Sequence, residues 1–300
     1  MGRAQAAAKQ VAKKNVPVVE ELHFKSDSAF LCLLLNRRTG FIRVIDFRSG
    51  ALPAKRLYIQ SVAKREGVTK VLTLVEKDEV SSWTRVGFVR EGTIPGFYKR
   101  SDGHLCGCLI GDKTASIEVT EAGVRAAERT INHAKKNARE VPEDLTMVST
   151  KMIDEAAAMK ARDEVWRRDK GLNSFDPFGR EADRMFMEAT APRGRANHLA
   201  AEYQDCFGHS LVEVLRPPED DLDVLAVTQG LRVLSQTLKD RGIVSAFGFT
   251  PAGDIGIATA YCAAGFRKTG LLAGGIYASG QRSDAILWTQ KLSNPTDDMI

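Results

Sequence analysis

The last part of this chain repeats the pattern of its first part. A G-F-x-x-x-G motif starts at Gly87 and again at Gly265, and an R-S-D-x-x-L motif follows each copy, starting at Arg100 and at Arg282. In both copies a glycine that ends a predicted helix precedes the two motifs. A repeat of this length corresponds to a whole domain and not to a short solenoid unit. The sequence therefore predicts two copies of one fold.

Length and composition agree with two globular domains. The chain has 300 residues, of which 43% are hydrophobic and 27% charged, as in ordinary globular proteins. It contains no run of about eighteen apolar residues, so no membrane span is expected. The net charge of +5 is mild and spread along the chain, so nucleic acid is not favoured as a partner.

The cysteines indicate a reducing compartment. There are five at irregular spacings, an odd number that does not suggest a disulfide framework. The sequence thus predicts a cytoplasmic protein. Cys106 and Cys108 lie one residue apart in a predicted strand without a cluster of further ligands nearby in sequence, so no metal site is expected.

Hydrophobic periodicity divides the chain into four parts. Residues 1–16 form a basic tail, 17–112 a first domain, 113–145 a helical linker and 146–300 a second domain. In each domain the expected element order is β–β–β–α–β–α–β–β. Residues 149–170 are expected to be one helix that opens the second domain, and residues 171–179, rich in Gly, Asn, Ser and Pro, are expected to be a loop.

The second copy carries a more specific pattern. It runs A-T-A-Y-C-A-A-G-F from Ala258 to Phe266 and continues with a strand that includes Asp284 and Trp288. This pattern, with the element order, resembles the GNAT superfamily of N-acetyltransferases. The first copy, "SSWTRVGFVREGTIPGFY", is similar to part of bacterial β-lysine N-acetyltransferases, as is the tandem layout. The resemblance implies an α/β (α+β) fold of two tandem GNAT-like lobes, each a mixed, mainly antiparallel sheet flanked by helices.

The resemblance also implies a reaction and its residues. GNAT enzymes transfer the acetyl group of acetyl-CoA directly to an amine, which requires a base for the amine and an acid for the leaving thiolate. Tyr261, four residues before Gly265, matches the acid position, and the first copy has Trp83 there. Glu213 is the candidate base, with Glu202 as the alternative. Each of these residues also has an interpretation without a catalytic role. Tyr261 is then an ordinary packing residue, and the two acids are solvated side chains on strands.

The pyrophosphate loop is only partly matched. Such a loop needs small residues and free backbone N–H groups at the start of a helix. Arg48, Ser49, Gly50 and Ala51 preserve part of the pattern in the first copy. The second copy has "RPPEDD" from Arg216 to Asp221 at this place, with prolines that lack an N–H and acids that repel phosphate.

Two hypotheses from different classes follow. The first is an acetyl-CoA-dependent N-acetyltransferase that acts on a small-molecule amine or on a protein amine, as a monomer or homodimer. The second, motivated by the absence of a complete phosphate loop, is a non-catalytic tandem GNAT-fold protein that senses acyl-CoA or binds other proteins.

Overall fold

The structure, a computed structural model, describes residues 16–26, 29–45, 50–111, 118–179 and 181–294. The basic tail, apart from Val16, lies outside these residues. The described part of the N-terminal half contains eight elements in the predicted order: β1 (Val19–Ser26), β2 (Ala29–Asn36), β3 (Phe41–Ile45), α2 (Leu52–Glu66), β4 (Lys70–Val75), α3 (Val80–Arg85), β5 (Val89–Ile94) and β6 (Gly103–Leu109).

The C-terminal half repeats that order after three added elements. The added elements are α4 (Glu121–Asn137), β7 (Ser149–Ile153) and α5 (Glu155–Arg167). The repeat comprises β8 (Asp183–Thr190), β9 (Ala196–Gln204), β10 (His209–Val214), α6 (Asp221–Asp240), β11 (Ser245–Pro251), α7 (Ile255–Ala263), β12 (Arg267–Ala278) and β13 (Gln281–Lys291).

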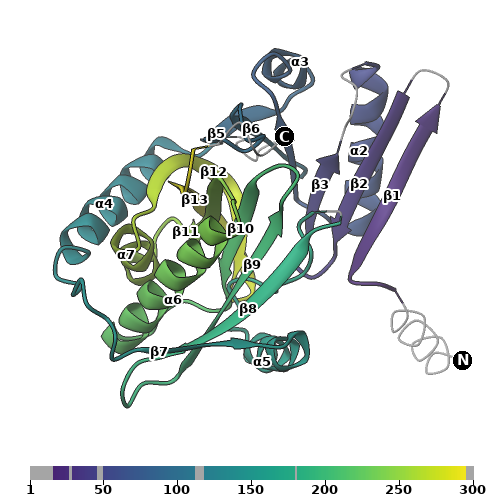
Figure 1. Cartoon of the computed structure of the whole chain (residues 1–300). Coiled ribbons are helices and arrows are strands. Elements are labelled where there is room, and N and C mark those ends of the chain that lie inside the picture. The colour runs from purple at the N-terminus through teal and green to yellow at the C-terminus, as the bar shows by residue number, and fades with distance from the viewer. Residues whose placement is uncertain (1–15, 27–28, 46–49, 112–117, 180, 295–300) are drawn as a thin grey trace, which may run out of the picture.

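All these strands form one sheet in the order β1-β2-β3-β4-β6-β5-β12-β13-β11-β10-β9-β8-β7 (Figure 1). From each outer edge of the sheet inward, neighbouring strands are antiparallel until one parallel pair is reached. This pair is β3 with β4 in the N-terminal half and β10 with β11 in the C-terminal half, and the final hairpin of each half follows it. The fold is therefore mixed α/β with a mainly antiparallel sheet flanked by helices, as predicted.

The two halves meet where β5 pairs with β12, and the residues at that point are the last glycines of the repeated motif. Gly92 lies opposite Gly270 in an antiparallel pair, as a two-fold relation between the copies requires. A Cβ on Gly270 would lie 2.7 Å from the Gly92 Cα and 2.6 Å from the Glu91 carbonyl oxygen. Both glycines are therefore needed for the strands to approach each other.

A buried ion pair also joins the halves at this junction. The Lys70 Nζ on β4 lies 2.6 Å from a Glu91 carboxylate oxygen on β5 and donates to the Ala273 carbonyl on β12 at 2.8 Å. The Ala273 N–H in turn donates to Glu91 at 3.0 Å. Such a pair is stable while each group keeps its partners, and removing one partner leaves a buried charge.

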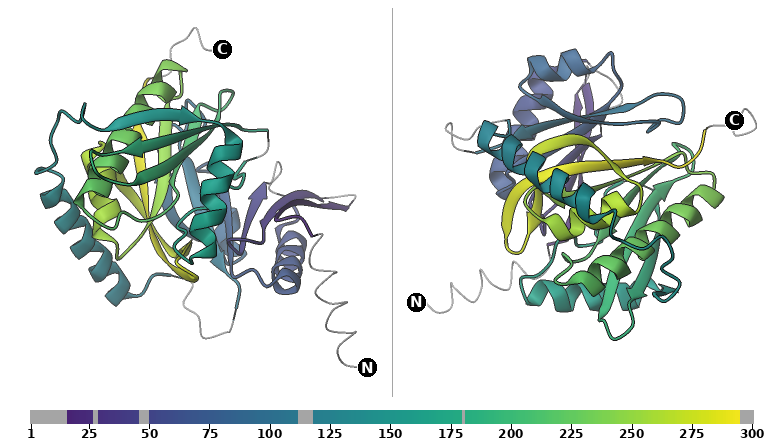
Figure 2. Two further views of the ribbon diagram at one scale, coloured as in Figure 1. Left: turned by 90° about the horizontal axis from the view of Figure 1, so that it is seen from below. Right: turned by 90° about the vertical axis from the view of Figure 1, so that its left-hand side faces the viewer.

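Helices cover both faces of the sheet (Figures 1 and 2). In the C-terminal half, α6 lies on one face of β8 and β9, with α7 beside it and α4 against α7. The other face carries α5, whose Ala158 packs with Phe186 of β8 and Ala200 of β9. Met185 and Met187, which alternate with Phe186, belong to the larger core of α6 and α7. This alternation places α5 and α6 on opposite faces.

Two details differ from the sequence prediction. Residues 149–153 form β7, which pairs with β8 at the edge of the sheet, and the helix begins only at Glu155. The Asp154 carboxylate accepts a hydrogen bond from the Ala157 N–H and so marks that start. That helix also ends at Arg167, before the predicted end at residue 170. Among the described residues, no helix is long and apolar enough to cross a membrane.

Candidate active site between the two halves

The parallel strands β10 and β11 separate part-way along their length. They pair only from His209–Ser245 to Leu211–Phe247. Beyond this point Val212 pairs only with β9, and Gly248 pairs only with β13. The two strands therefore splay apart after Leu211 and leave backbone groups of β10 without a neighbour on β11.

The Tyr261 hydroxyl lies at this opening. Its helix, α7, begins where the Asp254 carboxylate accepts from the Ile257 N–H at 3.1 Å and ends before Gly265, whose φ of +91° suits glycine. Tyr261 is fully buried, and its hydroxyl donates to the Val212 carbonyl at 3.0 Å. Burial, with a smaller effect of the Glu213 charge, raises the pKa of this hydroxyl far above its usual value. Tyr261 therefore carries its proton at neutral pH.

Glu213 lies on β10 next to Val212, and its side chain is half-buried. Burial raises the pKa of this carboxyl well above 4.5, and the nearby Glu202 and Asp176 carboxylates raise it further. No hydrogen bond or ion pair joins the Glu213 carboxylate to another of the described side chains. The alternative base, Glu202, is instead occupied by the Phe178 N–H, which donates to it at 2.8 Å, and by the Gly179 N–H. The structure thus leaves Glu213 as the available carboxylate near Tyr261.

Glu213 lines a cavity of about 90 Å³ between the halves. One wall comes from β2, β3 and β4 of the N-terminal half, and another from β10, β11 and β12 of the C-terminal half. Apolar side chains provide most of the lining, among them Leu34, Ile42, Leu72, Leu211, Phe249 and Ile276. A concave, mainly apolar cavity with a few polar groups is the usual form of a small-molecule site.

Arg43 of β3 is the cation of this cavity. Its Nη1 donates to the Phe178 carbonyl at 2.8 Å, and its guanidinium lies 4.3 Å from the centre of the Phe178 ring. Burial lowers the pKa of Arg43 from 12.5, against the opposing effect of Glu202. The buried Nε–H finds no hydrogen-bond partner among the described residues. A buried donor without a partner is unfavourable by about 1–3 kcal/mol.

The loop of residues 171–179 closes the cavity on the side of α5. It was predicted as a loop, and its chain is held at both ends: the Leu172 N–H donates to the Leu215 carbonyl at 2.8 Å, and Phe178 and Gly179 donate to Glu202. Between these points Asp176 accepts from Arg38 at 2.9 Å. The loop thus connects the α5 side of the C-terminal half with β2 and β3 of the N-terminal half.

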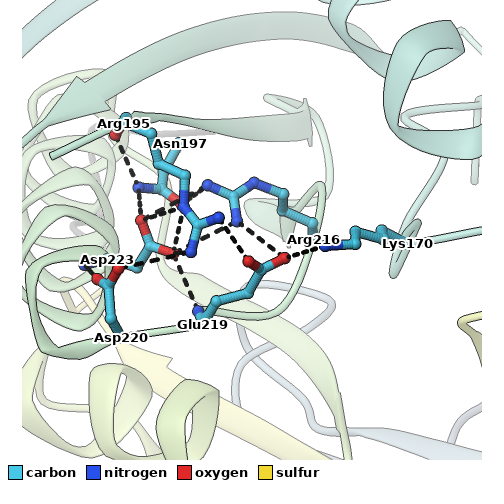
Figure 3. A network of polar contacts seen from close by, with 7 residues as sticks. All are labelled: Lys170, Arg195, Asn197, Arg216, Glu219, Asp220 and Asp223. Carbon is cyan, nitrogen blue, oxygen red and sulfur yellow. Dashed lines mark hydrogen bonds and ion pairs between the residues drawn. The ribbon is translucent and has the colours of Figure 1, made fainter. Parts of the chain in front are cut away.

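The start of α6 carries a closed network of charges (Figure 3). Asp223, almost fully buried, accepts from Arg195 at 3.0 Å and pairs with Arg216 at 3.3 Å. Glu219 pairs with Arg195 and, at 3.0 Å, with Lys170. Desolvation raises the pKa of Asp223, but hydrogen bonds from Arg195 and Asn197 outweigh it and lower that pKa to about 2. Because acids already neutralise these cations, this loop is poorly suited to a pyrophosphate, as the sequence indicated.

The start of α2 differs. It has no acidic residue in its first turn and no side-chain cap, and Ala51 before it adopts φ +54°. Arg48 and Ser49, the other predicted phosphate contacts, lie outside the described residues. At the position equivalent to Tyr261, the buried Trp83 packs edge-on against Phe88. The N-terminal half therefore has the more suitable helix start but lacks the tyrosine.

Sequence patterns pointed to Tyr261 and Glu213 but missed Arg43 and Asp176. Nothing in the sequence separates Arg43 from other arginines in strands, because its role depends on burial at the junction of the halves. The Pro177 that follows Asp176 identified a loop, but not its place over the cavity.

Solved structures with a similar shape cover about half of this chain. The ribosomal-protein-S18-alanine N-acetyltransferase from Escherichia coli is 13% identical, with 51% of this chain and 98% of that chain covered and a TM-score of 0.37. A spermidine N-acetyltransferase from Vibrio cholerae, solved in complex with CoA and spermine, is 8% identical, with 50% and 98% covered and a TM-score of 0.39. No protein-family model matches the chain, and no curated protein matches it.

Proposed function

We propose that this protein is an acetyl-CoA-dependent N-acetyltransferase of the GNAT type, built from two tandem lobes. One observation carries the proposal: the splayed strands β10 and β11 have the Tyr261 hydroxyl at their opening, and the residue of β10 after Val212, Glu213, lines the cavity between the halves. The similarity of the repeated sequence pattern to GNAT enzymes supports it. The predicted domain bounds, cytoplasmic location and monomeric or homodimeric state belong to the same proposal.

In the proposed reaction, Glu213 acts as the base for the amine and Tyr261 acts as the acid for the leaving thiolate. Glu213 takes a proton from the ammonium group, and the free amine attacks the thioester carbonyl carbon. The C–S bond then breaks, the Tyr261 hydroxyl gives its proton to the departing thiolate, and the second proton of the attacking nitrogen passes to the tyrosinate, which leaves a neutral amide. Tyr261 now donates to the Val212 carbonyl, so its hydroxyl must turn toward the sulfur during this step. Its raised pKa keeps the proton available until then.

The cavity favours a small amine that also carries a carboxylate. The Arg43 guanidinium on one wall suits a carboxylate group, and Glu213 on another suits an ammonium group. A volume of about 90 Å³ is less than the cavity of about 150 Å³ that admits benzene, so the acceptor's amino end must be slender. A protein amine fits this cavity only if the end of a lysine side chain enters it.

A panel of acceptors tests this proposal. Acetyl transfer from acetyl-CoA is measured with short amino acids and with amines of equal length that lack the carboxylate. We expect Glu213→Gln to lower kcat about 100- to 10,000-fold for all acceptors, and Arg43→Gln to raise KM for the carboxylated ones alone. Glu188→Gln, a change at a half-exposed acid of β8, serves as the control. No transfer to any amine would contradict the proposal.

We place the diphosphate of acetyl-CoA at the start of α2, whose first turn contains no acidic residue, with Pro53 as the one position there that lacks an N–H. An added carboxylate should repel it. At about 6 Å in water, two unit charges interact by about 0.7 kcal/mol, so Gly50→Asp should weaken the binding of a doubly charged diphosphate about tenfold. Gly111→Asp is the matched control, because a Cβ at either glycine meets nothing within 4 Å. Equal affinity of both variants would remove this placement.

The second candidate is a non-catalytic protein that binds acyl-CoA or another protein. Two observations favour it: the cations at the start of α6 are already paired with acids, and the Tyr261 hydroxyl already donates to the Val212 carbonyl. Binding of acetyl-CoA without turnover of any acceptor, unchanged by Glu213→Gln, would support this candidate.

A further inference from the structure

Three potential metal ligands of different types meet on the edge strand β1 and its neighbour β2. His23 lies directly opposite Cys32 in the antiparallel register, and Glu21, two residues before His23, is on the same face of β1. One ligand atom from each of the three residues lies within 4.8 Å of the others. The His23 Nε2 and a Glu21 carboxylate oxygen are 3.7 Å apart.

We propose that Glu21, His23 and Cys32 bind a zinc ion. Zn²⁺ accepts thiolate, imidazole and carboxylate ligands in tetrahedral geometry at about 2.0–2.3 Å, which places the ligand atoms about 3.3–3.7 Å from one another. The Glu21–His23 separation already falls at the upper end of this range. The other two separations between ligand atoms need to shorten by about 1.5 Å at most. A thiolate together with an imidazole favours zinc over magnesium or calcium, which take oxygen ligands.

The burial of the three residues allows that small movement. The Cys32 side chain is fully buried and fixed in the core, whereas the side chains of His23 and Glu21 are 43% and 32% exposed. The latter two can turn toward the thiol without disturbing the core. The His23 ring also stacks on Phe30 at 5.9 Å between centres, which limits its orientation. Three protein ligands leave the fourth position of the ion to water from the solvent side.

No sequence pattern predicts this site, because its three ligands are unevenly spaced along the chain and only the β1–β2 register brings them together. Leu34, the next residue of β2 on this face, lines the cavity between the halves. The site nevertheless does not depend on the acetyltransferase proposal, since its ligands take no part in that chemistry.

Cobalt(II), a spectroscopic substitute for zinc, tests the proposal on the full chain. The background carries Cys206→Ser, which removes an exposed thiol. We expect one equivalent of Co²⁺ to bind with a thiolate-to-cobalt charge-transfer band in the near ultraviolet, and Zn²⁺ to displace it. Cys32→Ser should abolish the band. His23→Gln should weaken binding at least tenfold, whereas His133→Gln, at an exposed histidine of α4, should leave it unchanged.

The result that overturns the proposal is a charge-transfer band that persists in Cys32→Ser, or equal Co²⁺ affinity of His23→Gln and His133→Gln. Absence of any band in the Cys206→Ser background overturns it as well. Circular dichroism shows whether Cys32→Ser folds. If it does not, the comparison of His23→Gln with His133→Gln tests the proposal alone, because both histidines are exposed and their replacement should not prevent folding.

Discussion

Replacing Tyr261 with phenylalanine separates its structural role from its proposed chemical role. The change removes one buried hydroxyl, which donates to the Val212 carbonyl at 3.0 Å, and keeps the packing of the ring against Trp288 and Phe266. Loss of one such hydrogen bond lowers the free energy of unfolding by about 1 kcal/mol. In a chain of this size that corresponds to a fall of about 2 °C in Tm. Loss of the general acid lowers kcat about 100- to 10,000-fold.

The matched control is Tyr98→Phe, because the Tyr98 hydroxyl also donates to a strand carbonyl, that of Leu74, at 3.2 Å. Both variants are compared by urea unfolding and by the rate of thiol release from acetyl-CoA with a saturating acceptor. We expect similar losses of stability and a large loss of kcat for Tyr261→Phe alone. Equal kcat values for the two variants would refute the assignment of Tyr261 as the acid.

Three further predictions concern the same structure. A Cβ at Gly248 would lie 2.5 Å from both the Tyr261 hydroxyl and the Val212 carbonyl oxygen. We therefore expect Gly248→Ala to lower the free energy of unfolding, measured in urea, by about 1–3 kcal/mol. The control Gly253→Ala should leave it nearly unchanged, because a Cβ at Gly253 meets no atom within 4 Å. Burial raises the pKa of Glu213 above 4.5, so the folded state holds this proton more tightly than the unfolded state. Stability should therefore fall as pH rises from about 4.5 through the raised pKa, by at most about 1.4 kcal/mol per pH unit, and Glu213→Gln should remove this slope in unfolding measured across pH. Lys70→Met should lower the free energy of unfolding by about 3–5 kcal/mol because it leaves the buried Glu91 unpaired, and adding Glu91→Met should restore part of that loss.

Much of the fold follows from local sequence patterns. The duplicated motifs end in Gly92 and Gly270, and these two glycines prove to be the contact between the halves. The long helix α6 has an apolar stripe at helical spacing, with Leu231, Leu234 and Leu238 fully buried. Short-range signals were enough here because each element has its own apolar period and its own turn residues.

The errors have physical reasons. Residues 149–153 form a strand because β8 offers an edge to pair with, and five residues of mixed polarity show too little alternation to reveal this. For the site, the sequence identified residues on single elements, such as Tyr261, but not the approach of Arg43 to the cavity. That approach depends on how the two halves pack, which no local pattern encodes.

Calorimetric titration of the full chain with acetyl-CoA tests the central proposal most directly. The proposed enzyme requires one molecule of acetyl-CoA per chain, with a Kd in the micromolar range, and a tenfold weaker Kd for Gly50→Asp but not for Gly111→Asp. No heat of binding at millimolar acetyl-CoA would contradict the proposal of an acetyl-CoA-dependent enzyme.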